Sequence, residues 1–163
     1  MPDRHPEELG RLVLEALRRA RVRGVVSAGW AGLGPREVRD EVLVVEDIPH
    51  DWLFARMAAV VHHGGAGTTH AGLRAGLPSV IVPFFLDQPF WGRRVAHLGL
   101  GPAPIPRRHL SADLLAGAIT AAVTDGGMSR QAAEAGAIIR AEAGVKAAVD
   151  VFQRQFASIG GRS

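Results

Sequence analysis

A glycine-rich turn between an apolar run and a predicted helix is the part of this sequence best suited to binding an anion. Residues 60–69 read VVHHGGAGTT. Glycine lets a backbone approach an anion closely, and the first turn of a helix offers unpaired N–H groups at the positive end of its dipole. His63, Thr68 and Thr69 add side-chain donors. The pattern predicts a diphosphate site, although a tight strand-to-helix connection uses the same glycines.

Several familiar motifs are excluded. No Gly-Lys-Ser/Thr sequence occurs, so the turn has no P-loop lysine. The run Gly65-Ala66-Gly67 lacks the third glycine of the dinucleotide fingerprint, and no acidic ribose partner follows it. A Gly-x-Ser-x-Gly elbow and metal-ligand spacing are also missing, which argues against a phosphate-binding hydrolase. The adjacent His62 and His63 point to opposite faces of a strand.

A second candidate loop carries Asp87 and Gln88, between an apolar run and the next predicted helix. A carboxylate accepts hydrogen bonds and an amide both donates and accepts them, so the pair suits vicinal hydroxyls of a sugar. The alternative is that Asp87 only caps the helix that follows it.

Two further segments follow strand-like runs. Residues 47–54 read DIPHDWLF, and Trp30 follows the run at 24–28. In an open α/β sheet, ligands bind beyond the carboxyl ends of the strands, so these segments are expected to share one edge with the two loops above. Ligand contact and packing are equally open roles for Trp30.

The elements that must hold these loops alternate helix and strand, which is typical of an α/β domain with a mostly parallel sheet. Apolar residues at spacings of three and four predict a helix over residues 6–21. Strands are expected at 24–28, 42–46, 58–62, 79–82 and 100–105. Helices are expected at 68–75, at 88–98, from the N-cap Ser111 onward, at 129–142 and at 145–156.

The composition is that of an ordinary globular domain, with 163 residues of which 47% are apolar. The absence of cysteine excludes disulfides, thiolate metal sites and cysteine nucleophiles. The 19 basic and 16 acidic residues are interspersed and leave a net charge of +3, which argues against a nucleic-acid partner. No apolar run approaches the roughly 20 residues of a membrane span, so a soluble, cytoplasmic protein with no integral membrane segment is expected.

Together, these segments resemble the donor-binding half of family 1 glycosyltransferases. The resemblance is carried by residues 48–54 (IPHDWLF), 62–69 (HHGGAGTT), 76–78 (GLP) and 83–92 (PFFLDQPFWG). The sterol 3-beta-glucosyltransferase branch is the most similar. The resemblance implies the Rossmann-like, C-terminal half of a GT-B enzyme with a doubly wound parallel sheet. It also implies inverting transfer of a hexose, usually glucose, from a UDP-sugar to a hydroxyl of a lipid, sterol or natural product, without a cofactor or a metal.

The resemblance implies a role for each matched position. Ile48 and His50 would face the uracil and ribose of the donor. Asp87 and Gln88 would face the sugar hydroxyls. The residues that would face the diphosphate are His63, Gly65, Ala66, Gly67 and Thr68, and Trp30 and Thr69 are further candidates for donor binding. His62 is expected to be structural. Two positions depart from the family: Ala71, where plant members place a glutamate, and Leu86, where a smaller residue is usual.

The resemblance also implies what lies outside these residues. Family members carry an N-terminal acceptor domain of similar size that supplies the catalytic histidine, so no catalytic residue is expected here. The first, central strand of the donor domain is expected to be absent as well, which leaves the strands at 24–28 and 58–62 without the neighbour between them. Residues 1–157 are predicted to be the donor domain and 158–163 a disordered tail.

The expected partners are therefore a nucleotide sugar and an acceptor domain or partner chain. The alternative function is a non-catalytic nucleotide-sugar-binding module, or a subunit that needs a separate acceptor-domain partner. No acceptor-activating base accompanies the predicted donor loops, and this feature is what keeps the alternative open.

Overall fold

The sheet consists of two separate pairs of parallel strands. The computed structural model describes residues 6–27, 41–46 and 48–160. Strand β1 (Gly24–Ser27) pairs with β2 (Val42–Val45), and β3 (Val60–His62) pairs with β4 (Ser79–Ile81). Within the described residues no hydrogen-bonded ladder joins β1 to β3. The predicted α/β class with parallel strands is confirmed.

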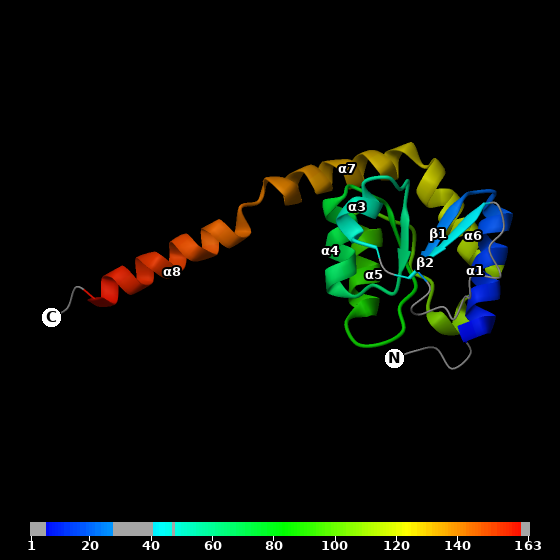
Figure 1. Ribbon diagram of the computed structural model, residues 1–163, viewed down its shortest axis with the longest axis horizontal. Coiled ribbons are helices and arrows are strands. Elements are labelled where there is room, and N and C mark those ends of the chain that lie inside the picture. Colours follow the sequence, from blue (N-terminus) through cyan, green and yellow to red (C-terminus); the bar gives the residue numbers. More distant parts are fainter. Residues whose placement is uncertain (1–5, 28–40, 47, 161–163) are drawn as a thin grey trace.

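The helices alternate with these strands and then follow one another in the C-terminal third (Figure 1). They are α1 (Pro6–Ala20), α3 (His50–Phe54), α4 (Ala66–Arg74), α5 (Gln88–His97), α6 (Ala112–Thr124), α7 (Gly126–Ala141) and α8 (Gly144–Gly160), with a short 3₁₀ helix η2 (Arg107–His109) before α6. The predicted N-cap is confirmed, because the Ser111 hydroxyl accepts a hydrogen bond from the Leu114 amide at 3.2 Å.

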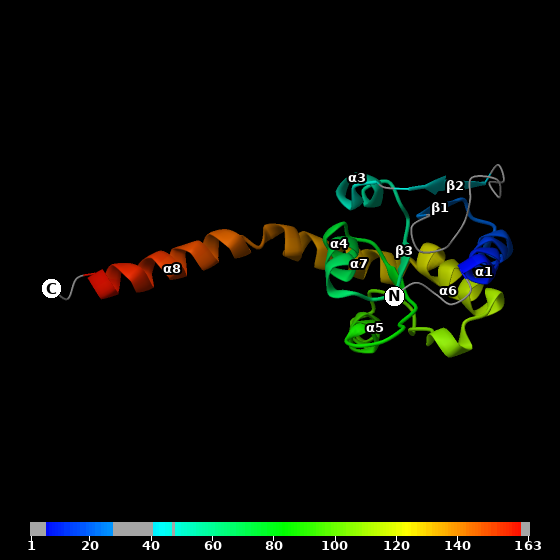
Figure 2. The same ribbon diagram turned by 60° about the horizontal axis from the view of Figure 1, so that its bottom comes forward.

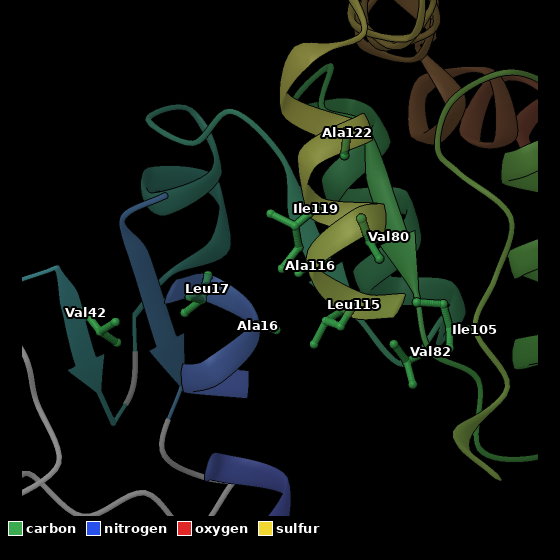
Figure 3. Packing of buried hydrophobic residues seen from close by; sticks show 10 residues of the cluster. All are labelled: Ala16, Leu17, Val42, Val80, Val82, Ile105, Leu115, Ala116, Ile119 and Ala122. Atoms are coloured by element: carbon green, nitrogen blue, oxygen red, sulfur yellow. The ribbon is translucent and has the colours of Figure 1, made fainter. Parts of the chain in front are cut away.

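Helix α1 and helix α6 pack against each other to form one side of the main core (Figure 3). The apolar spacing of α1 buries Ala16 and Leu17, and α6 contributes Leu115 and Ile119. Strands β2 and β4 add Val42 and Val80, one from each strand pair. The core therefore reaches both halves of the divided sheet.

A polar cluster fastens α1 to the start of α6. The Glu15 carboxylate accepts hydrogen bonds from Arg18 and Arg19, and these bonds lower its pKa to about 2. Arg19 also pairs with Asp113 in the first turn of α6. The pair between Glu15 and Arg19 follows from helical spacing, whereas the contact with Asp113 joins residues 94 positions apart.

The predicted strand at 100–105 is wrong. These residues run beside β4, where the Ser79 amide donates to the Leu100 carbonyl at 2.9 Å and the Ile105 amide donates to the Ile81 carbonyl at 3.0 Å. Pro102 and Pro104 lack amide hydrogens, so the ladder cannot continue between those two bonds.

Helix α8 projects away from the rest of the molecule (Figures 1 and 2). The described side chains from Ala141 to Phe156 are all exposed. Helix α8 continues to Gly160, beyond the end at residue 156 that its apolar pattern predicts, and the disordered tail at 158–163 stays a prediction. Once a helix is nucleated, each added residue gains a hydrogen bond at little cost, so an apolar pattern underestimates its end.

Candidate functional site

The glycine-rich turn runs from the end of β3 into α4. Gly64 has a φ of +88°, a left-handed backbone conformation that favours glycine. A Cβ at this position would lie 2.7 Å from Ile81 Cγ2 and 3.2 Å from the backbone oxygen of Gln88. The turn therefore lies directly against β4 and the first residue of α5, and no larger residue fits there.

His63 and Gly65 contact each other at the N-terminal end of α4. A Cβ on Gly65 would come within 2.5 Å of His63 Nε2, so the imidazole lies over the glycine. Gly65 is the N-cap residue, and its carbonyl accepts a hydrogen bond from the Thr69 amide at 2.9 Å. The N–H groups of residues 66–68 precede that bond, and a Cβ on Gly67 would meet nothing within 4 Å. An imidazole and three helix-start donors thus lie beside open space.

His62 has a structural contact. Its Nδ1 accepts a hydrogen bond from the Gly64 amide at 3.0 Å, which places the proton of the neutral ring on Nε2. Burial, with smaller contributions from nearby His63 and His50, lowers the pKa of His62 to about 4. The ring is therefore neutral at pH 7, and its buried Nε2 has no hydrogen-bond partner among the described residues.

The two threonines of α4 differ sharply in accessibility. Thr68 is half-buried and lines a cavity described below. Thr69 is 1% exposed, and its hydroxyl has no hydrogen-bond partner within the described part of the chain. The hydroxyl of Thr69 is thus turned away from solvent and from a ligand at the turn.

Asp87 and Gln88 hold the second loop together. Asp87 is the N-cap residue of α5 but makes no capping hydrogen bond with its side chain. Its Oδ2 accepts a hydrogen bond from Trp91 Nε1 at 2.9 Å, and the carboxylate is exposed. Gln88 is 6% exposed, and its Oε1 accepts hydrogen bonds from the amides of Phe84 and Phe85 at 2.8 and 3.2 Å. The amide oxygen of Gln88 is therefore engaged by the loop, and its Nε2 is the group left for a ligand.

The loop contains Leu86, whose backbone is left-handed, and it lies beside Arg107, which the sequence did not indicate. Leu86 has a φ of +56° and a side chain that is 83% exposed. Arg107 lies over the ring of Phe84, with its guanidinium carbon 5.9 Å from the ring centroid. Arg107 is distant in sequence and follows a proline-rich segment, so no local pattern pointed to it.

Five of the predicted residues line a cavity between the two strand pairs, which we call the interstrand cavity. Its volume is about 1370 Å³. The predicted residues along its lining are Ile48, His50, His63, Thr68 and Gln88. The imidazole of His50 stacks on Phe54 with ring centroids 4.6 Å apart. Gly65, Ala66, Gly67, Thr69 and Asp87 are not part of the lining, and Trp30 lies outside the described residues.

Among the described residues, no group of three or more histidine, aspartate or glutamate side chains could hold a metal ion. Within the same residues, no helix combines the length and the apolar character needed to cross a bilayer.

Comparison with protein families decides the relationship of the chain. Residues 26–147 match the model of the erythromycin biosynthesis protein CIII-like C-terminal domain. The chain belongs to this family. The matched range includes the glycine-rich turn, the loop of Asp87 and Gln88, and the segment of Ile48 and His50.

Sterol glucosyltransferases are similar to this EryCIII-like domain along most of its length. The Arabidopsis thaliana sterol 3-beta-glucosyltransferase UGT80B1 is 49% identical over 156 residues, which cover 94% of this chain and 25% of that protein. The sterol 3-beta-glucosyltransferase of Cryptococcus neoformans is 38% identical and is covered over 10% of its length. The chain thus spans a quarter or less of these two curated relatives.

Solved glycosyltransferase structures share the fold of the EryCIII-like domain. The kitacinnamycin glycotransferase superposes with a TM-score of 0.76 at 23% identity, covering 89% of this chain and 39% of that one. SnogD from Streptomyces nogalater gives a TM-score of 0.64 at 26% identity, covering 82% of this chain and 36% of that one. The predicted fold, a part of a GT-B glycosyltransferase, is therefore confirmed.

Proposed function

We propose that this chain is the donor-binding domain of an inverting glycosyltransferase and that it binds a UDP-hexose, with glucose as the sugar. The acceptor would be a hydroxyl group of a lipid, a sterol or a natural product. The observation that carries the proposal is the junction at Gly64, where the turn of His63 lies against the first residue of α5. The turn that would bind a diphosphate and the loop that would bind sugar hydroxyls are thereby held next to each other.

In this proposal the diphosphate binds at the start of α4. His63 and the N–H groups of residues 66–68 would donate to its oxygens, and the positive end of the helix dipole would add to the attraction. These groups are in place before the reaction, so they stabilise the negative charge that develops on the leaving diphosphate. The proposal requires neither a cofactor nor a metal.

The sugar would bind at the loop before α5. The exposed carboxylate of Asp87 is oriented by Trp91, and an oriented carboxylate accepts hydrogen bonds from two neighbouring hydroxyls. Gln88 would donate from Nε2 while its oxygen holds the loop. Ile48 and His50, on the lining of the interstrand cavity, would contact the uracil and ribose.

We assign no catalytic base to the described residues, so an acceptor hydroxyl would be activated by a group from another domain or chain. If no such group is supplied, the chain is a non-catalytic nucleotide-sugar-binding module. Mixing the chain with a separately produced acceptor domain and following transfer of labelled glucose separates these two functions. Transfer supports the enzyme, and saturable binding without transfer supports the module.

Calorimetric titration with UDP-glucose, UDP and dTDP-glucose tests the donor site itself. We expect saturable binding of UDP-glucose, abolished in His63→Ala and reduced in Asp87→Ala to the affinity of UDP alone. The two nucleotides are separate arms because VinC, which is 24% identical, was solved with dTDP. If the chain binds dTDP-glucose more tightly than UDP-glucose, the proposed nucleotide base is wrong, but the proposed donor site remains.

His97→Ala is the matched control for His63→Ala. His97 is exposed at the C-terminal end of α5, roughly 14 Å along the helix from Gln88 at 1.5 Å per residue. We expect this variant to bind like the unmodified chain. The proposed site is contradicted if both histidine variants lose the same affinity for UDP-glucose, or if His63→Ala binds UDP-glucose as well as the unmodified chain.

A further inference from the structure

The loop between β4 and α5 carries three consecutive apolar side chains that the fold leaves uncovered. Phe84, Phe85 and Leu86, which we call the apolar triplet, are 39%, 47% and 83% exposed. Single exposed apolar residues are common on protein surfaces, whereas a contiguous group of large ones marks a surface that contacts a ligand or a partner. The triplet directly precedes Asp87, the carboxylate of the candidate sugar site.

Leu86 has a backbone conformation that glycine adopts without strain and leucine does not. Arg21 and Leu86 are the two residues other than glycine with a positive φ in the described part of the chain. A side chain is unfavourable in this region, and the exposed side chain of Leu86 gains no burial within the domain. Such residues cluster at ligand-binding sites, where a contact with the ligand offsets the strain. The conformation of Leu86 therefore points to a contact with another molecule.

Hydrogen bonds hold the apolar triplet in one arrangement. The Gln88 side chain accepts bonds from the amides of Phe84 and Phe85, and the Arg107 amide donates to the Pro83 carbonyl at 3.3 Å. The guanidinium of Arg107 lies over the ring of Phe84, and Phe84 and Phe85 line the interstrand cavity together with Gln88. A surface that is already ordered binds a ligand with a smaller loss of conformational entropy.

The chemistry of this surface favours a small molecule that is apolar on one side and carries a sugar on the other. Consecutive Cα atoms lie about 3.8 Å apart, so a hexose bound by Asp87 is within reach of the Leu86 side chain. The side chains of the triplet have no hydrogen-bonding group, so they bind a ligand through apolar area alone. A protein–protein interface takes about 20–30 residues from each side, far more than this triplet offers.

We infer that the apolar triplet is an acceptor subsite, in which Phe85 and Leu86 contact the apolar part of the acceptor beside the sugar bound by Asp87. The acceptor class that fits this subsite is a neutral molecule whose hydroxyl group is attached to an alkyl or alicyclic skeleton. The donor domain thereby contributes to the choice of acceptor. This inference rests on the proposed function, because the triplet meets the acceptor only if Asp87 binds the transferred sugar.

Alkyl β-glucosides test this subsite, because inverting transfer joins the acceptor oxygen to C1 of the sugar opposite the departing diphosphate and gives a β-glucoside. The probes are n-hexyl and methyl β-D-glucoside, each kept below the concentration at which micelles form. They are titrated into the isotope-labelled chain with saturating UDP, and the amide shifts are followed by NMR. We expect the hexyl glucoside to bind at least tenfold more tightly and to shift the amides of Phe85 and Leu86, since each buried methylene strengthens binding up to about fourfold.

Two substitutions in the triplet locate the effect. Phe85→Ser and Leu86→Gly should each reduce the preference for the hexyl over the methyl glucoside to about threefold or less. Phe152→Ser is the matched control, because Phe152 is 64% exposed on α8, which projects away from the rest of the molecule (Figure 1). This variant should keep the full preference. The inference is overturned if the triplet variants keep the preference, or if the control loses as much of it as they do.

Titrations of n-hexanol and of UDP alone separate the remaining outcomes. Hexanol should bind at least tenfold more weakly than hexyl glucoside, because it lacks the sugar that Asp87 binds. Equal affinity for hexanol would show a surface that takes any apolar chain, such as a membrane lipid, and would overturn the inference. If UDP does not bind, the proposed function and this inference fail together. If UDP binds and the hexyl chain strengthens glucoside binding less than threefold, the inference alone is wrong.

Discussion

Gly67 offers a substitution whose effects on stability and on binding have opposite signs. It lies in the first turn of α4, where a Cβ would meet nothing within 4 Å. Alanine is favoured over glycine inside a helix by about 0.5–1 kcal/mol, which corresponds to a rise of about 1–4 °C in melting temperature for a chain of this size. The open space that admits the methyl group is also the space in which the proposed diphosphate approaches the helix start.

We therefore expect Gly67→Ala to melt at a higher temperature and to bind UDP-glucose at least tenfold more weakly, a loss of about 1.4 kcal/mol. Gly117→Ala is the matched control, since Gly117 lies in α6 and its Cβ would also meet nothing within 4 Å. It should gain similar stability and keep its affinity for UDP-glucose. Thermal denaturation and calorimetric titration of the two variants measure both effects. If Gly67→Ala is stabilised and binds as well as Gly117→Ala, the diphosphate does not bind at the start of α4.

Three further predictions concern stability. Thr69→Val should raise the free energy of unfolding by about 1 kcal/mol in urea denaturation, because it removes a buried hydroxyl without a partner, whereas Thr68→Val should change it little. Leu86→Gly should stabilise by up to about 1 kcal/mol, since it relieves a left-handed leucine whose exposed side chain contributes no burial; a destabilised variant would show that the loop needs this side chain. The folded-state pKa of His62, about 4, lies below its ordinary value of 6.5, so the unfolded chain binds the proton first as pH falls. The contribution of neutral His62 to the free energy of unfolding should thus be fully present above pH 6.5 and should fall by up to about 3 kcal/mol toward pH 4. Melting curves recorded across this range should show a weaker pH dependence of stability in His62→Asn.

Local patterns in the sequence predicted most of the helices and the positions of all four described strands. The spacing of apolar residues gave α1, and Ser111 marked the start of α6, because both signals depend on neighbours along the chain. The prediction of a strand at 100–105 failed because it was based on the apolar residues of this segment, whereas its prolines limit how many ladder hydrogen bonds can form. Such a conflict is settled by the backbone and not by hydrophobicity.

Sequence patterns could select residue types for the candidate site but could not show which atoms of each side chain are left free. The sequence placed Gln88 beside a ligand, and the structure shows that its oxygen is occupied by the amides of Phe84 and Phe85. It offered Thr69 as a donor, although helical geometry turns that hydroxyl into the core. Arg107 was missed because its approach to Phe84 depends on tertiary packing. Which atom of a side chain remains free is a property of the folded loop.

Gly64 joins the two halves of the candidate site at a single point. Because even a Cβ at Gly64 would lie 2.7 Å from Ile81 Cγ2 and 3.2 Å from the Gln88 carbonyl oxygen, we expect the turn and the loop to move together. The separation between the proposed phosphate-binding and sugar-binding groups is therefore set by this close approach of the turn to the loop. In the proposed site, the donor would be selected by the span from its diphosphate to its sugar hydroxyls. We expect variation among related domains to change which hydroxyls are recognised while that span stays constant.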